Sequence, residues 1–220
     1  NFLIESYNEF EEDKLFSRSN HNEKLTLLTY LTNCLCKNKK HKESIKYAEL
    51  LLISMKEYDS FLHDKYLFFY YNILVSNYAK TDKDKALDYL NKASNNEVIK
   101  KLPSYTSFIY LNKALIYFHE DNFRQAQKNM SRLILQEDFI LLDKGFQLKV
   151  LIADVIIRFK NGHQYIIDKI EDIRKNHQHY MRSFIINYIF TFQNNASGIK
   201  CGRIVISHIH NRCQRLQCIF

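Results

Sequence analysis

The residues best suited to metal chemistry lie near the C-terminal end of the chain. They are Cys201, His208, His210, Cys213 and Cys218. Zinc takes about four nitrogen or sulfur donors in a tetrahedron, and short tracts rich in Cys and His supply such donors. The order His-x-His-x2-Cys-x4-Cys, however, matches no structural zinc pattern that we recognise. We therefore interpret these residues as incidental members of a tail, and we predict no metal and no cofactor.

Positive charge is concentrated in the same part of the chain. The formal net charge is +8, and residues 174–220 contain seven basic and no acidic residues. A basic region can contact nucleic-acid phosphates, although a solvated basic end is commoner. Association with nucleic acid is therefore our alternative functional hypothesis. The residues that would make these contacts are Arg174, Lys175, Arg182, Arg203, Arg212 and Arg215.

Catalytic motifs are lacking. The sequence contains no nucleophile elbow, phosphate-binding loop, paired carboxylates or HExxH motif. Its four glycines are too few for a loop that cradles phosphates. We therefore predict that the protein is not an enzyme.

The composition and the apolar pattern favour an all-α fold. One proline and four glycines in 220 residues fit long helices joined by short turns. Apolar residues recur with helical spacing, as at Leu111, Ala114, Leu115 and Phe118. The pattern predicts helices over residues 1–16, 23–37, 41–57, 60–79, 83–94, 104–119, 122–136, 139–160, 164–176 and 179–193.

These helices form a repeated pattern of antiparallel pairs. The clearest pair spans residues 110–133 and turns at Asp121-Asn122, and residues 28–51, 70–93 and 150–173 show the same pattern. Alignment of the four pairs makes Ser44, Ala86, Ala126 and Ile166 equivalent, at intervals of 42, 40 and 40 residues. Three of these four residues are small, so the two helices of a pair are expected to pack closely. Such a repeat is typical of a helical solenoid.

The pair at residues 110–133 resembles a divergent tetratricopeptide repeat (TPR). The resemblance depends on Tyr110, Ala114, Tyr117, Phe123, Ala126, Met130 and Leu133. It extends over residues 23–178 and implies a right-handed α-solenoid of about four antiparallel helix pairs. The period exceeds the family's 34 residues. Lys56, Val98, Asp138 and Gln178 stand where the family has its closing proline. Other helical-pair repeats with a period of about 40 residues fit the same pattern.

The resemblance also implies a function. In this family the first helices of the pairs line a groove that binds a protein or peptide. The residues at such positions include Asn33, Lys37, Tyr71, Asn72, Tyr78, Asn112, His119 and Arg158. Some members of the family clamp a C-terminal carboxylate, but Thr29, Phe108 and Asn112 occupy positions where the clamp needs cations. We therefore predict a protein-protein interaction scaffold or regulatory adaptor without that clamp. The aromatic run at 68–71 could serve as a binding platform, but core packing is the interpretation that we favour.

The predicted organisation has three parts. Residues 1–22 form the second helix of a truncated repeat with its turn, residues 23–193 form the array, and residues 194–220 form a basic tail.

The sequence shows no signal-peptide pattern and no apolar run that could span a bilayer. The five cysteines, an odd number, suggest reduced thiols. We therefore predict a cytoplasmic protein without membrane contact, and an exposed end at residues 1–16 that favours self-association.

Overall fold

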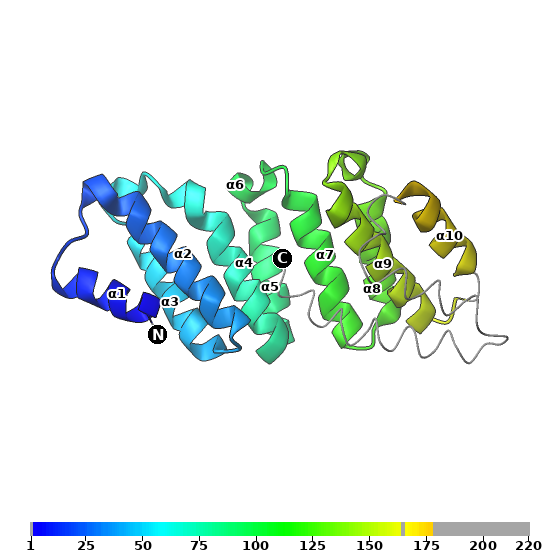
Figure 1. The fold of residues 1–220 in the computed structure, drawn as a ribbon, viewed down its shortest axis with the longest axis horizontal. Helices are drawn as coiled ribbons and strands as arrows, with labels where there is room; N and C mark the ends of the chain where they lie inside the picture. The colour runs from blue at the N-terminus through cyan, green and yellow to red at the C-terminus, as the bar shows by residue number, and fades with distance from the viewer. Residues whose placement is uncertain (1, 164–165, 178–220) are drawn as a thin grey trace. The chain divides into compact units, whose positions relative to one another are not determined.

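The protein is all-helical in the part that the structure describes. A computed structural model describes residues 2–163 and 166–177, and these ranges contain ten α-helices and three short 3-10 helices but no strand (Figure 1). The α-helices are α1 (Phe2–Glu12), α2 (His21–Lys37), α3 (His41–Ser54), α4 (His63–Thr81), α5 (Lys83–Asn95), α6 (Glu97–Lys100), α7 (Tyr105–His119), α8 (Phe123–Ile134), α9 (Lys144–Lys160) and α10 (Ile167–Asn176).

The chain divides into two compact units within α7, at residues 1–112 and 113–220. In the first unit α2 packs against α3, α4 packs against α5, and α4 also contacts both helices of the preceding hairpin. In the second unit α9 packs against α8 and α10. The predicted pairs α2/α3 and α4/α5 are therefore confirmed as neighbouring helices.

Polar side chains mark the starts of several helices. Asp82 accepts a hydrogen bond from the backbone N–H of Lys85 at 3.1 Å, at the start of α5. Asn122 and Asp143 accept the corresponding bonds at the starts of α8 and α9. These side chains satisfy backbone donors that have no partner inside the helix. At α5 such a cap helps to explain how a single residue, Asp82, can join two helices.

The small residues of the repeat lie where the helices of a pair meet. Ser44, Ala86 and Ala126 are all 0% exposed, and Ile166 is also buried. The Ser44 hydroxyl donates a hydrogen bond to the backbone oxygen of Thr32, on the other helix of its pair, at 2.8 Å. Such a contact requires a close approach of the two backbones, which a larger side chain at position 44 would prevent.

Three expectations about helix boundaries are corrected by the structure. The helix expected over 139–160 begins only at Lys144, because Glu137–Leu141 forms a 3-10 helix and Asp143 then caps α9. Ile140 and Leu141, which lie in this 3-10 helix, are exposed. The first helix, expected over residues 1–16, ends at Glu12, which is four residues before the expected end. The short helix α6, which Asn96 caps, was not predicted.

The loop between α3 and α4 contains a left-handed turn. Tyr58, Asp59 and Ser60 have φ angles of 53°, 61° and 59°, and none of them is a glycine. A residue with a side chain pays roughly 1–2 kcal/mol in this region because its Cβ approaches the following carbonyl oxygen. The turn is therefore a locally strained connection.

We expect Ser60→Gly to stabilise the protein by about 0.5–1 kcal/mol. Glycine removes the Cβ clash at a positive φ, and this gain outweighs its larger entropy in the unfolded chain. The measurement is the free energy of unfolding in urea. Ser104→Gly is the matched control, because Ser104 is also exposed but does not have a positive φ. An equal gain in both variants would contradict the assignment of strain to residue 60.

No helix in the described part of the chain is long and apolar enough to cross a membrane.

Candidate partner-binding face

The helices α2 and α4 are joined by a polar seam near their N-terminal ends. The Tyr66 hydroxyl lies 2.7 Å from Thr26 Oγ1 and donates to the backbone oxygen of Asn22 at 3.0 Å. Lys65 Nζ donates to Asn22 Oδ1 at 2.6 Å. These bonds connect residues about 40 positions apart in the sequence. They hold the two first helices of neighbouring pairs side by side.

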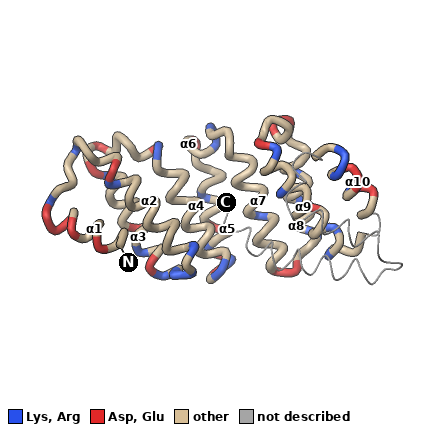
Figure 2. The backbone as a smooth tube through the Cα atoms, in the orientation of Figure 1, with Lys and Arg blue, Asp and Glu red and all other residues tan. Residues whose placement is uncertain are grey.

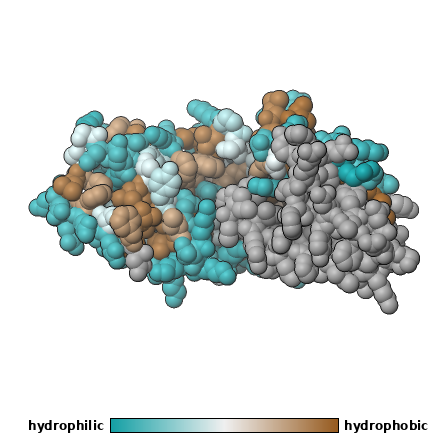
Figure 3. Space-filling view, viewed as in Figure 1, coloured by the Kyte–Doolittle hydropathy of each residue, from teal (hydrophilic) through white to brown (hydrophobic). Residues whose placement is uncertain are grey.

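Two exposed aromatic residues continue this seam toward the C-terminal ends of the helices. Tyr30 on α2 is 63% exposed and Phe69 on α4 is 41% exposed. Because residues three or four positions apart share one side of a helix, Tyr30 follows Thr26, and Phe69 follows Lys65. Figure 3 shows apolar atoms over α2 and α4 on the visible side. We call Tyr30, Asn33, Phe69 and Asn72 together the α2/α4 face.

The two asparagines of this face, Asn33 and Asn72, are both half-buried. The amide N–H of Asn33 donates to the backbone oxygen of Thr29 at 2.9 Å, which leaves its amide oxygen for a partner. Lys37 is exposed in the last turn of α2. In Asn112, the amide donates to the backbone oxygen of Phe108 at 2.8 Å.

Tyr71 and Tyr78, which we also expected in the groove, lie on another side of α4. Tyr78 stacks on Tyr89 of α5, with ring centroids 5.5 Å apart. Burial raises the pKa values of both Tyr71 and Tyr78. Tyr71 lies two residues after Phe69, which is about half a turn of the helix. Tyr78 lies nine residues after Phe69, which is about two and a half turns. Both tyrosines therefore point to the opposite side of α4 from Phe69. They belong to the packing between α4 and α5.

The aromatic run at 68–71 is divided in the same way. Tyr70 is buried, Phe68 and Tyr71 are half-buried, and Phe69 is exposed. The ring of Phe68 meets that of Phe108 at 5.1 Å between centroids. Most of the run therefore packs inside the unit, and Phe69 alone among the four is exposed.

The remaining predicted groove residues lie in the second unit. The Arg158 Nε donates to the fully buried Asp154 at 2.9 Å, and Lys169 pairs with the same carboxylate oxygen. Arg158 is therefore part of the packing between α9 and α10. His119 is half-buried in the last turn of α7, and its ring lies 6.0 Å from that of Phe118.

Only two residues of the predicted basic region can be described. Arg174 pairs with Glu171 within α10, and Lys175 is exposed. Arg182, Arg203, Arg212 and Arg215 lie outside the described residues, as do the Cys and His residues considered for zinc. Within residues 2–163 and 166–177, no group of three or more His, Cys, Asp or Glu side chains is placed to hold a metal ion.

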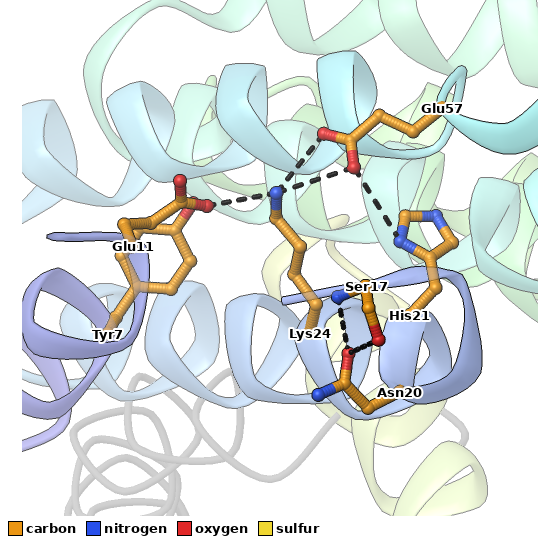
Figure 4. Close-up of polar contacts among 7 residues, drawn as sticks. All are labelled: Tyr7, Glu11, Ser17, Asn20, His21, Lys24 and Glu57. Carbon is orange, nitrogen blue, oxygen red and sulfur yellow. Dashed lines mark hydrogen bonds and ion pairs between the residues drawn. The ribbon is translucent and has the colours of Figure 1, made fainter. Parts of the chain in front are cut away.

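Sequence reasoning missed a buried ionic cluster at the start of the first unit. We call Tyr7, Glu11, His21, Lys24 and Glu57 the Lys24 cluster (Figure 4). Its central cation lies between two carboxylates, with Lys24 Nζ 2.9 Å from Glu11 Oε1 and 3.1 Å from Glu57 Oε1. The Lys24 side chain is only 9% exposed. The cluster connects α1 and α2 to Glu57, the residue that precedes the turn at Tyr58–Ser60 in the α3–α4 loop.

The charges of the cluster support one another. Burial on its own disfavours the charged amine of Lys24, but the bonds from Glu11 and Glu57 outweigh burial and raise its pKa. Burial likewise disfavours the Glu11 carboxylate, but bonds from Lys24 and Tyr7 lower its pKa. The Tyr7 hydroxyl donates to Glu11 Oε1 at 2.9 Å. Each charge therefore has a partner, as buried charges require.

His21 forms the other end of the cluster. It is almost fully buried, and Nδ1 lies 3.7 Å from Glu57 Oε2. The rings of Tyr58 and Phe61 pack against its imidazole. Burial lowers the pKa of His21, with Glu57 opposing this effect. The sequence signal for the cluster was the place of Lys24 on α2: it lies four and seven positions before the core residues Leu28 and Leu31, so helical periodicity puts it on the inward side.

Taken together, the described residues form an all-helical protein in which successive helices pack as neighbours, with an aromatic and polar face on α2 and α4. Comparison of the chain with models of known families, with curated proteins and with solved structures gives no match.

Proposed function

We propose that the protein is a non-catalytic scaffold or regulatory adaptor, and that the α2/α4 face binds a protein or peptide. In this proposal the helix pairs continue as a right-handed, TPR-like solenoid, and the protein works in the cytoplasm. The support for the solenoid is the repeat at positions 44, 86 and 126, where a small residue is buried in each pair.

The exposure of Tyr30 and Phe69 is the observation that carries the proposal. Aromatic side chains are enriched in protein interfaces, because each buries a large apolar area at a small cost in conformational entropy. Here two of them lie on adjacent helices that a hydrogen-bonded seam holds in place. A binding surface that is already rigid loses little entropy when a partner binds.

Polar groups beside the aromatic residues would add specificity. The amide oxygen of Asn33 and the side chain of Asn72 can bond to the backbone of a peptide that crosses the face. A C-terminal carboxylate is a poor ligand here, because Thr29 is buried and bonded to Leu25, and Phe108 is buried. We therefore propose an internal segment with an apolar anchor as the bound element.

The test compares recovery of partners by the wild type and by Tyr30→Ala/Phe69→Ala. Both proteins are used in nuclease-treated pull-downs from a lysate of the native host, with quantitative mass spectrometry. Each anchor is expected to contribute about 1–2 kcal/mol, so recovery of a specific partner should fall at least about tenfold. Ile53→Ala is the matched control, because Ile53 is an equally exposed apolar residue on α3. Unchanged recovery by the double variant would refute the assignment of this face.

A further inference from the structure

A second surface of the first unit is lined by lysines. The turn between α2 and α3 and the turn between α4 and α5 lie side by side, because His41 Nδ1 is 3.0 Å from Asn77 Oδ1 near the end of α4. Figure 2 shows basic residues gathered at these helix ends. We call the lysines of the two turns the lysine edge: Lys37, Lys39, Lys40, Lys42, Lys80, Lys83 and Lys85.

The contact that aligns the two turns is part of a buried network. The Asn77 amide N–H donates to Ser44 Oγ at 2.8 Å, and Ser44 in turn donates to Thr32 across the first pair. Asn77 is 0% exposed. The network therefore holds the two turns next to each other, so that the lysines project from one connected part of the fold.

Basic residues outnumber acidic residues along the edge. Its seven lysines are accompanied by only three acidic residues, Glu43, Asp82 and Asp84. Lys40 and Lys85 pair with Glu43 and Asp82 at 3.5 and 3.4 Å. All seven lysines except the half-buried Lys83 are exposed. By residue count the edge thus has four more lysines than acidic residues, spread over the two turns and the helix ends that flank them.

The general abundance of lysine in the chain does not explain this surface. The equivalent residues 120–125 at the α7–α8 turn contain one basic residue, Arg124, and two acidic residues, Glu120 and Asp121. In the same unit as the edge, α1 contains four glutamates and no basic residue. Charges in the first unit are therefore separated, which creates a local positive potential.

The chemistry of the edge favours a phosphate backbone over a protein. Protein interfaces depend on a buried apolar centre, whereas contacts to phosphates need only cations. Within residues 37–46 and 80–86, which the structure describes completely, no large apolar side chain is exposed. A strand that carries a phosphate on every nucleotide can contact lysines on both turns at once.

We propose that the lysine edge binds the phosphate backbone of a nucleic-acid strand. This site is distinct from the α2/α4 face, and it is also distinct from the basic residues at 174–220. Binding depends on charge rather than on sequence, because the lysines contact phosphates and do not read bases.

The test uses the full chain and a fluorescently labelled single-stranded RNA of about 20 nucleotides, a length that exceeds a typical binding site. The variant is Lys37→Gln/Lys39→Gln/Lys42→Gln, which removes three exposed charges of the edge. The matched control, Lys14→Gln/Lys56→Gln/Lys101→Gln, removes three exposed lysines from other parts of the first unit. Fluorescence anisotropy gives the affinity of each protein between about 50 and 300 mM salt.

We expect the edge variant to bind RNA about tenfold more weakly than the wild type near physiological salt. The slope of log affinity against log salt should become shallower by about two, because three phosphate contacts are lost and each releases about 0.7 counterion. The control should bind within about twofold of the wild type, and polyglutamate at equal charge should compete poorly.

Three results would overturn the proposal. The first is equal loss of binding in the edge and control variants, which would indicate a net-charge effect. The second is equally effective competition by polyglutamate, which would indicate an acidic protein partner. The third is wild-type affinity in the edge variant together with lost binding in Arg203→Gln/Arg212→Gln/Arg215→Gln, which would assign RNA binding to the C-terminal region. None of these results bears on Tyr30 or Phe69, so the proposed protein-binding face is tested separately.

Discussion

Lys24→Met is expected to lower the free energy of unfolding by about 2–3 kcal/mol. Removal of one partner from a buried ion pair costs about 3–5 kcal/mol when the remaining charge stays buried. Here the side chains left without their cation, Glu11 and Glu57, are 42% and 34% exposed, so water compensates part of the loss. Methionine keeps the length and most of the apolar stem of lysine. Urea unfolding followed by circular dichroism measures the difference.

The matched control is Lys92→Met, which removes an ion pair at the protein surface. Lys92 and Asp88 are an i,i+4 pair, and both side chains are more than half exposed. Exposed pairs contribute little to stability, because water screens them. We therefore expect no measurable change in the control. If Lys24→Met also leaves the stability unchanged, the cluster does not hold α1 against α2.

The pH dependence of the Lys24 variant provides an independent check. The pKa of Glu11 is lowered in the folded protein, so its contribution to stability is present above the ordinary value of 4.5 and is lost as the pH falls through the lowered pKa. The pKa of Lys24 is raised, so its contribution is present below 10.5 and is lost as the pH rises through the raised pKa. The difference between the wild type and Lys24→Met should therefore be largest between these limits and should shrink in acid.

Ala86→Leu is expected to destabilise the protein by about 2–3 kcal/mol. Ala86 is completely buried in the first turns of α5, which packs against α4. The added atoms have no free space, so the helices must separate or the side chain must adopt a strained rotamer. The same urea titration measures this effect. Ala79→Leu is the control, because Ala79 lies nearby on α4 but is only half-buried. Equal stability of Ala86→Leu and the wild type would show that the two helices do not meet at this position.

The residue equivalent to Ala86 in the fourth helix pair is larger, so the effect expected of Ala86→Leu does not apply to every pair. Ile166 occupies it in the second unit and packs with Leu148, Val155 and Ile173. A large branched residue is therefore buried at this position in the second unit, where the other three pairs have a small one. In all four pairs the residue at this position is buried, but it is small in only three of them.

Much of the helical structure was predictable from the sequence. The helices expected over 83–94 and 104–119 are found at Lys83–Asn95 and Tyr105–His119. Helical periodicity and capping are local properties, because they involve residues within about four positions of one another. The start of α9 was predicted wrongly, because the apolar run at 139–142 continues the periodic pattern. Asp143, which caps the helix, was the local signal that we did not use.

The candidate sites were only partly predictable. The sequence by itself indicated that α2 and α4 are helices and placed Asn33 and Asn72 among the candidate groove residues on them. Only the tertiary structure decided that Phe69 is exposed, that Tyr78 stacks on α5 and that Lys24 is buried between two carboxylates. Lys24 and Glu57 are 33 residues apart, and His41 and Asn77 are 36 apart. Contacts at such separations depend on how the helices pack against one another. Helical periodicity indicates which side of a helix faces inward, but it does not indicate which side chains of two helices meet.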